Sequence, residues 1–215
     1  MSIPMIPKSP IRVDVWSDVQ CIWCYISSAR LRTAIDRHLG SVEVVYHSFQ
    51  LTPDAPVDVD REAHIRRHNV DPGRMRQIMT QLKQLTAQEG LPYDPDSTQP
   101  TNSHQALELL HYSGTLGTRA ELTQRLFEAH FAEGRHVGRV DELLTIAEET
   151  GLDRDAAAAA LADRRYVTAV DMDIQHAHQL GARGVPFYVI NRTHSLSGAQ
   201  PVEQFLATFD QATGS

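Results

Sequence analysis

The residues in this sequence best suited to chemistry are its two cysteines, Cys21 and Cys24, which lie three positions apart. Thiols at this spacing can form and break a disulfide between themselves. The pair falls where an alternating run typical of a strand (11–16) gives way to apolar residues at helical spacing (22–39). The first turn of a helix has unpaired backbone N–H groups and the positive end of the helix dipole, and both favour a thiolate. The sequence therefore predicts a redox-active pair at a helix start.

Three other roles for the pair must be weighed. A structural disulfide is disfavoured, because such a bond stabilises mainly by closing a long loop in the unfolded chain and the loop between Cys21 and Cys24 is very short. A closed zinc site needs four ligands, and the sequence holds no second cysteine pair to supply them. Two inert buried thiols remain an alternative, because free cysteine is often buried.

Size and composition are those of a soluble protein with one large domain, or a domain with an insertion. The chain has 215 residues, of which 41% are hydrophobic and 22% charged. The net charge of −7 and the lack of a basic cluster argue against a nucleic-acid partner. No apolar run approaches the roughly 18 residues of a membrane span, and the first residues do not resemble a signal peptide. We expect a cytoplasmic protein, a compartment where a close cysteine pair is more often catalytic or metal-binding than structural.

Predicted strands lie near both ends of the chain, with predicted helices between them. The strands are expected at 11–16, 42–49, 186–190 and 194–197. The helices are expected over 22–39, from Pro72 until Gly90, after the capping pair Asn102 and Gln105, and over 119–133, 140–150, 154–163 and 201–212.

This order predicts an α/β architecture. The opening strand–helix–strand segment is a parallel crossover unit, and the two late strands are close enough to form an antiparallel hairpin. We interpret residues 11–60 and 166–215 as one sheet domain, residues 61–165 as an inserted all-helical subdomain, and residues 1–10 as an N-terminal tail.

Several motifs follow one another along the chain: Val15-Trp16-Ser17-Asp18, Cys24-Tyr25-Ile26, Asn102-x-His104, Leu126-Phe127-x-Ala129-x-Phe131, Glu133-Gly134-Arg135, Gly184-Val185-Pro186-Phe187 and Ser197-Gly198-Ala199-Gln200-Pro201. In this order, the sequence resembles proteins with the thioredoxin fold in its DsbA-like form. More narrowly, it resembles the FrnE-type oxidoreductases of the 2-hydroxychromene-2-carboxylate isomerase and DsbA superfamily. The match runs from about residue 11 to residue 209. It implies a central mixed sheet flanked by helices, with a large helical insertion.

The resemblance also implies a second half of the site, a cis peptide bond between Val185 and Pro186 that faces the dithiol. Proline has no N–H, and the Val185 backbone would be free to pair with an extended substrate chain. From the residues alone, a proline that merely starts a strand is the favoured explanation. We expect Cys21, nearer the helix start and more exposed, to be the nucleophile, and Cys24 to be the buried resolving thiol.

The sequence departs from its relatives between the cysteines. The family usually has proline after the first cysteine, whereas this chain has Ile22 and Trp23. It also lacks the histidine that DsbA places there to stabilise a thiolate. We therefore expect a less oxidising redox couple than that of DsbA.

Five further residues are candidates with structural alternatives. Asp18 is a candidate for proton transfer to the dithiol, although an aspartate here also suits a turn or helix cap. Trp23 and Tyr25 could bind the apolar part of a substrate, or pack in the core. Asn102 and His104 recur in the resemblance and could line a cleft beside the dithiol, although capping explains Asn102 equally well.

Histidine pairs do not make a convincing metal site. His64 and His68 share a helix face, and His176 and His178 are two apart, but neither pair has the pattern of a His-Glu-x-x-His site. We expect no metal and no cofactor beyond the redox-active disulfide.

The residues and the resemblance together favour a thiol–disulfide oxidoreductase or isomerase acting on protein thiols and disulfides. The main alternative is a glutathione-dependent isomerase or transferase of an aromatic or polyketide-type small molecule, with glutathione as co-substrate. Those relatives usually carry serine at the position of Cys21, so the intact pair favours the first reading. A binding module with a vestigial dithiol is a third. The sequence is compatible with a homodimer.

Overall fold

The computed structural model describes residues 10–60 and 71–214. Within them, four strands form one mixed sheet in the order β2-β1-β3-β4. The strands are β1 (Ile11–Ser17), β2 (Val42–Ser48), β3 (Phe187–Ile190) and β4 (His194–Ser197). β1 is parallel to β2, whereas the β1–β3 and β3–β4 pairs are antiparallel. The predicted crossover unit and late hairpin are both confirmed.

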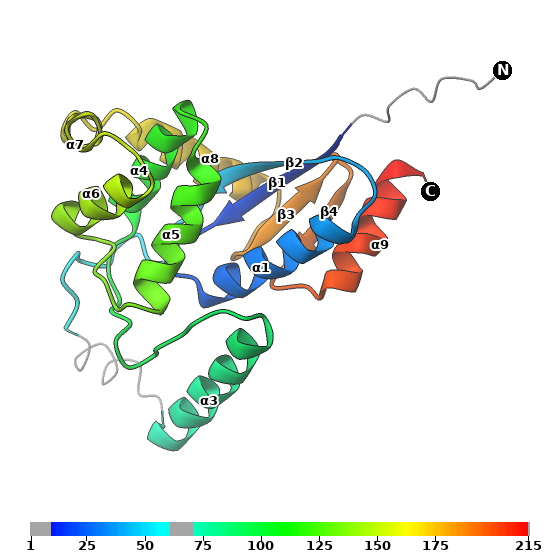
Figure 1. The fold of residues 1–215 in the computed structure, drawn as a ribbon, viewed down its shortest axis with the longest axis horizontal. Coiled ribbons are helices and arrows are strands. Elements are labelled where there is room, and N and C mark those ends of the chain that lie inside the picture. Colours follow the sequence, from blue (N-terminus) through cyan, green and yellow to red (C-terminus); the bar gives the residue numbers. More distant parts are fainter. Residues whose placement is uncertain (1–9, 61–70, 215) are drawn as a thin grey trace.

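The alternation in β1 explains why both faces of the sheet are covered. Val13 and Val15 point toward α1 (Ile22–Arg37) and α9 (Val202–Thr213), where they pack with residues such as Leu31 and Phe205. Trp16 points to the other face, where α8 (Val167–Gln179) packs. Figure 1 shows α1 and α9 side by side over one face of the sheet. The sheet is therefore the rigid support from which the β1–α1 turn projects.

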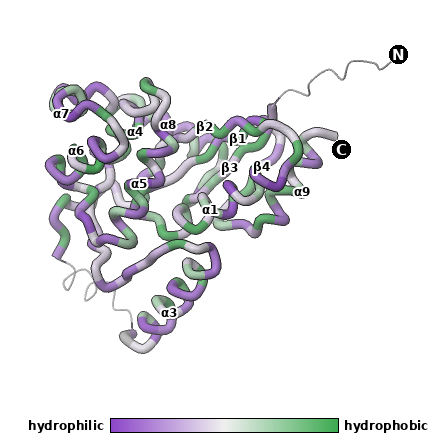
Figure 2. The backbone as a smooth tube through the Cα atoms, viewed as in Figure 1, coloured by the Kyte–Doolittle hydropathy of each residue, from purple (hydrophilic) through white to green (hydrophobic). Residues whose placement is uncertain are grey.

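The remaining helices form a second body with its own apolar core. They are α4 (His104–Thr115), α5 (Arg119–Phe131), α6 (Val140–Glu149) and α7 (Arg154–Ala162). Leucines and alanines on their inner faces are almost fully buried, and Val170 of α8 joins them. Helix α3 (Pro72–Gln88) stands apart from this body in Figure 1, and in Figure 2 its tube is mostly polar. Asp71 caps α3 as predicted, accepting a hydrogen bond of 2.8 Å from the Arg74 N–H.

Among the helices and strands of the described residues, α8 alone is not predicted from the sequence. Only Val170 and Ala177 of α8 are buried, so its apolar periodicity is weak. Polar contacts hold it instead: the Trp16 indole N–H donates to the Asp173 carbonyl at 3.0 Å. The other predicted helices end within about two residues of their observed ends, the usual uncertainty of helix boundaries. The start of α4 also differs, because Ser103 rather than Asn102 is its N-cap.

Across the described ranges, no helix is both long and apolar enough to cross a membrane.

Candidate active site

Cys21 is the N-cap residue of α1, as the sequence predicts. Its N–H donates to the Asp18 carbonyl at 3.0 Å, which closes the turn after β1. Its carbonyl accepts from the N–H groups of Cys24 and Tyr25 at 2.9 and 3.1 Å and so starts the helix. Among the described residues, the Ile22 N–H has no backbone acceptor, as expected for the first turn of a helix. That N–H exists because Ile22 replaces the usual proline.

The second half of the site lies directly against Cys21. The Cys21 thiol donates to the Val185 carbonyl oxygen at 3.4 Å. The Val185–Pro186 peptide bond is cis, which confirms the expectation drawn from the resemblance. The Pro186 carbonyl accepts from the Gly198 N–H at 2.8 Å, so the loop is fixed to the end of β4. The Val185 N–H has no backbone hydrogen-bond partner within residues 10–60 and 71–214, and it stays available to another chain.

Cys24 is the thiol that the fold keeps protonated. Burial raises the pKa of Cys24 well above its ordinary value, and its hydrogen bond to Cys21 and the charge of Cys21 raise it further. The Asp18 N–H and the Ser17 hydroxyl oppose this rise only in part. The two thiols are therefore within hydrogen-bond reach of each other, and both are free cysteines here.

The expected exposure of Cys21 is wrong. Cys21 is 5% exposed and Cys24 is 3% exposed, so the two hardly differ. Both belong to an apolar cluster that brings together four segments distant in sequence. The cluster contains Cys21, Cys24, Tyr25, Phe127 and Phe131, with Ile22, Leu91, Tyr93 and Val185 packed against it. The segment after α3 and the aromatic face of α5 thus enclose the helix start, and a substrate must displace part of this cover to reach the sulfur.

Trp23 and Tyr25 have opposite environments. Trp23 is 44% exposed although it is next to the dithiol, so it remains a candidate for substrate contact. Tyr25 is fully buried and stacks on Phe131 with ring centroids 5.4 Å apart. This burial contradicts a direct substrate contact for Tyr25. Its hydroxyl donates to the Pro92 carbonyl at 3.3 Å, and this bond fastens the segment after α3 to α1.

Asp18 is completely buried, and its carboxylate accepts hydrogen bonds from backbone N–H groups. One oxygen accepts from the Gln20 N–H at 3.1 Å and the other from the Leu51 N–H at 2.8 Å. Burial raises the pKa of Asp18, although these two hydrogen bonds act in the opposite direction. The contacts explain Asp18 as a residue that holds two loops together. Proton transfer by Asp18 stays a prediction.

Asn102 and His104 make structural contacts. The Asn102 amide donates to the Pro53 and Ala55 carbonyls, and its oxygen accepts from the Gln50 side chain and from the His104 N–H. The His104 ring lies 3.0 Å from a carboxylate oxygen of Glu108. These bonds hold the loop after β2 to the start of α4. A role for either side chain in binding substrate stays a prediction.

Metal chemistry gains no support from the described parts of the chain, where no group of three or more His, Cys, Asp or Glu could hold an ion. His176 and His178 lie exposed on α8. His64 and His68 lie outside the described residues.

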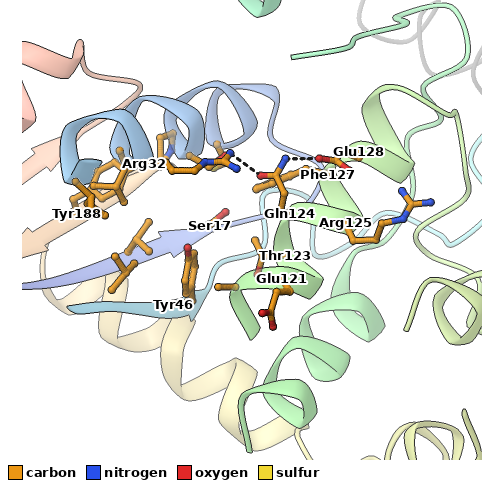
Figure 3. A pocket seen from close by; sticks show the side chains of 18 residues that line it. Ser17, Arg32, Tyr46, Glu121, Thr123, Gln124, Arg125, Phe127, Glu128 and Tyr188 are labelled. Carbon is orange, nitrogen blue, oxygen red and sulfur yellow. Dashed lines mark hydrogen bonds between the residues drawn. The ribbon is translucent and has the colours of Figure 1, made fainter. Parts of the chain in front are cut away.

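Sequence reasoning missed a cavity of about 450 Å³ on the far side of Cys24. It lies between α1 and α5 over the sheet (Figure 3). Cys24 and Pro186 contribute to its lining. The signal in the sequence was a set of small or apolar residues at helical spacing. Cys24, Ser28, Leu31 and Ile35 share one face of α1.

Comparison with known proteins identifies the family to which this chain belongs. A model described as a DSBA-like thioredoxin domain matches residues 12–210. The chain belongs to this family. A solved structure of a probable DsbA oxidoreductase from Streptomyces coelicolor is 32% identical to the chain, with a TM-score of 0.90 over 95% of this chain and 91% of that one. The resemblance stated from the motifs, and the thioredoxin-like α/β fold, are confirmed.

Two more distant structures share the fold. A 2-hydroxychromene-2-carboxylate isomerase is 20% identical, with a TM-score of 0.69 over 94% of each chain. The cytosolic disulfide reductase DsbM from Pseudomonas aeruginosa, solved with GSH, is 20% identical, with a TM-score of 0.63 over 94% of this chain and 96% of that one. The DsbA-like family member described here thus has both oxidoreductases and an isomerase among its structural neighbours.

Proposed function

We propose that the protein is a thiol–disulfide oxidoreductase that acts on protein disulfides through a mixed disulfide on Cys21. The observation that carries this proposal is the contact between the Cys21 thiol and the Val185 carbonyl beside a cis proline. In this proposal Cys21 is the nucleophile, and the contact supports the role because the Cys21 thiol lies next to a backbone segment that an extended peptide could join. The raised pKa of Cys24 supports the division of roles, because a protonated thiol does not attack first.

The proposed reaction exchanges two electrons and two protons between the dithiol and a substrate disulfide. The Cys21 thiolate attacks one substrate sulfur, the substrate S–S bond breaks, and the released sulfur leaves as a thiolate. Cys24 then loses its proton and attacks the Cys21 sulfur. The mixed disulfide breaks, the second substrate thiol is released, and the Cys21–Cys24 disulfide forms. Run in reverse, the oxidised protein donates its disulfide to a substrate dithiol.

Two features of the site support a polypeptide substrate. The N–H and C=O groups of Val185 are those that an added strand uses, once the substrate displaces the Cys21 thiol from the carbonyl. The exposed indole of Trp23 offers an apolar contact next to the sulfur. We further propose the cytoplasm as the compartment, where a dithiol without structural disulfides is usual.

Reduction of insulin by dithiothreitol, followed as turbidity, tests this proposal. Wild-type protein is expected to accelerate the reaction, and Cys21→Ser to abolish the acceleration. Cys24→Ser is expected to lose turnover while it still forms the mixed disulfide. Wild-type acceleration that survives in Cys21→Ser would contradict the assigned nucleophile.

Glutathione is the alternative partner, because its cysteine could use the same Val185 backbone groups. If wild type does not accelerate insulin reduction but is retained on immobilised glutathione, the glutathione-dependent isomerase becomes the better proposal. If it does neither, the vestigial-dithiol binding module remains.

A further inference from the structure

The resolving step of the proposed exchange requires Cys24 to lose its proton. In the reduced protein the Cys24 thiol is hydrogen-bonded to the Cys21 sulfur. Once Cys21 carries the substrate, its sulfur is bonded to a second sulfur and is no longer a thiolate that can hold this proton. The proton then needs another acceptor, in a cluster whose other members include the rings of Phe127 and Phe131.

Besides the Cys21 thiol, the Cys24 sulfur contacts the Asp18 N–H and the Ser17 hydroxyl, and these two groups differ in chemistry. A backbone N–H donates a hydrogen bond and cannot accept a proton, whereas a hydroxyl is both donor and acceptor. The Ser17 oxygen can therefore take the thiol proton on a lone pair while its own proton passes to a neighbour. Of these two contacts, only Ser17 can relay a proton.

The alternation of β1 places Ser17 at Cys24. Ser17 is the last residue of the strand and lies on the same face as Val13 and Val15, the face that α1 covers. The Ser17 carbonyl accepts from the Phe49 N–H at 3.0 Å, which fixes the strand end to the segment after β2. The Ser17 side chain therefore faces Cys24 from a rigid support.

The Ser17 hydroxyl also faces the cavity between α1 and α5. Ser17 and Cys24 both line this cavity, and Figure 3 shows the hydroxyl pointing into it. Its volume of about 450 Å³ has room for several waters, since one water occupies roughly 30 Å³ in the liquid. Polar partners for water are present on Thr123, Gln124 and Glu128, which line the same space.

The cavity connects Ser17 with solvent. Arg32 and Glu121 line it and are exposed, and Ser17 itself is partly exposed. The Asp18 carboxylate, the acceptor considered from the sequence, is completely buried and does not line the cavity. A proton that leaves Cys24 through Ser17 thus reaches bulk water by a polar route.

We propose that Ser17 is a catalytic residue of the resolving step, a hydroxyl that passes the Cys24 proton to water in the cavity. This inference rests on the proposed exchange activity. As the Cys24 sulfur attacks the Cys21 sulfur, its proton moves to the Ser17 oxygen, and the Ser17 proton moves to water and on to solvent. The Cys21–Cys24 bond forms, the bond from Cys21 to the substrate sulfur breaks, and the substrate leaves as a thiolate. Both electrons of the broken bond leave with the substrate sulfur, and Ser17 ends the step as a hydroxyl.

Rapid mixing of the reduced full-length protein with dithiobis-nitrobenzoate, at one reagent per chain, tests the relay. This aromatic disulfide releases one coloured thiolate when Cys21 attacks it and a second when Cys24 resolves the mixed disulfide. A single trace therefore reports the rates of attack and of resolution separately. Cys24→Ser should give the first release alone, which assigns the two phases.

Ser17→Ala should slow the second release by about tenfold to a hundredfold, the worth of a hydrogen bond to a charged group, and leave the first near the wild-type rate. Ser17→Thr keeps a hydroxyl at this position and should restore the second rate. Ser28→Ala is the matched control, because Ser28 lines the same cavity but its hydroxyl donates to the Tyr25 carbonyl at 2.7 Å. Both of its rates should equal those of wild type.

Deuterium oxide separates a relay from a hydroxyl that only stabilises the Cys24 thiolate. The second release from wild type should slow in deuterium oxide, whereas the first should not, because only the resolving step moves a proton. A second release that is equally fast in both solvents overturns the relay.

The proposal is also overturned if Ser17→Ala resolves at the wild-type rate, if it slows both releases equally, or if Ser28→Ala is as slow as Ser17→Ala. Dithiobis-nitrobenzoate is not a polypeptide, so both rates are obtained whether or not the protein accelerates insulin reduction. Failure of the relay and failure of the proposed activity therefore give different results.

Discussion

The Cys21 thiol lies 3.4 Å from the carbonyl oxygen of Val185, although 164 positions separate the two residues. The sheet causes this contact. β1 and β3 are antiparallel neighbours, and Trp16 pairs with Phe187 at the end of that ladder. The turn that leaves β1 and the loop that enters β3 must therefore meet at the same end of these two strands, and the dithiol faces the cis proline there.

Cys24→Ser is expected to trap the mixed disulfide. The Cys21 sulfur can still attack a disulfide, but the sulfur that resolves the intermediate is gone. Incubation with oxidised glutathione should leave one glutathione on Cys24→Ser, measured by intact mass, and dithiothreitol should remove it. Cys21→Ser should acquire little adduct, because burial keeps Cys24 protonated. Equal adduct on the two variants would contradict the assignment of roles.

Tyr25→Phe is expected to expose Cys21. The change removes the hydrogen bond to the Pro92 carbonyl that fastens the segment after α3 to α1. A net hydrogen bond is worth about 0.5–1.5 kcal/mol, so alkylation of Cys21 by iodoacetamide should accelerate by about twofold to tenfold if opening of this segment controls access. The rate is measured in the Cys24→Ser background. Tyr112→Phe, in α4 and outside the cysteine cluster, is the control. Equal rates in both variants would show that another part of the cluster limits access.

The placement of the dithiol could be predicted from sequence because it depends on local pattern. The switch from alternating to helical periodicity at Ser17–Ile22 locates the turn, and β4 has the predicted bounds 194–197. The burial of Cys21 could not be predicted in this way. It depends on Leu91 and on Phe127, which reach the helix start from segments remote in sequence.

The packing of α8 on the other face of the sheet could not be predicted from sequence either. Helix α8 has a weak apolar stripe and is held by contacts to Asp173, whose partners come from β1, β2, α4 and α5. Such a polar network has no periodic signal. The Asp18 side chain is similar, because its partner Leu51 comes from the loop after β2.

His47 gives the protein a pH-dependent link between β2 and α8. Its ring nitrogens lie 3.0 Å from Asp173 and 2.8 Å from Asp14, and because both carboxylates accept, both ring nitrogens donate. Burial alone would lower the pKa of His47, but the hydrogen bonds to Asp173 and Asp14 outweigh it and the net pKa is raised. The other titratable or charged groups around His47 and its two carboxylates are His111 and Arg119, which contact Asp173, and Arg12, which contacts Asp14.

A histidine whose pKa is higher in the folded than in the unfolded protein stabilises the fold at low pH, where it is protonated. The contribution of His47 is complete below its unfolded pKa of about 6.5 and is lost as the pH rises through the higher folded value. The free energy of unfolding should therefore fall as the pH rises above about 6.5. His47→Gln should lower it by about 2–4 kcal/mol at acidic pH and remove most of this slope, since two carboxylates lose a cationic partner. Urea unfolding at several pH values measures both effects. His178→Gln, exposed on α8, should keep the slope, and an unchanged slope in His47→Gln would contradict the assignment.

Trp23→His is expected to make the redox couple more oxidising. The dithiol has no cationic side chain between its cysteines, and the Trp23 side chain lies partly in solvent, so a histidine there is tolerated. A protonated imidazole beside the Cys21 sulfur would stabilise the thiolate and hence the reduced form. A stabilisation of about 1.4 kcal/mol shifts the potential by roughly 30 mV toward less negative values. Equilibration with reduced and oxidised glutathione measures it.

Trp23→Gln is the control for Trp23→His, because it removes the indole without adding a positive charge. The redox potential of Trp23→Gln should remain near that of wild type.

The redox potential of the wild-type protein should be more negative than the roughly −120 mV of DsbA, because the dithiol lacks that histidine. Ile22→Pro should not move the potential toward DsbA. It removes the Ile22 N–H, a donor that has no backbone acceptor in the described structure and is free to face the thiolate. A wild-type potential equal to that of DsbA would mean that groups outside the intervening dipeptide set the redox balance.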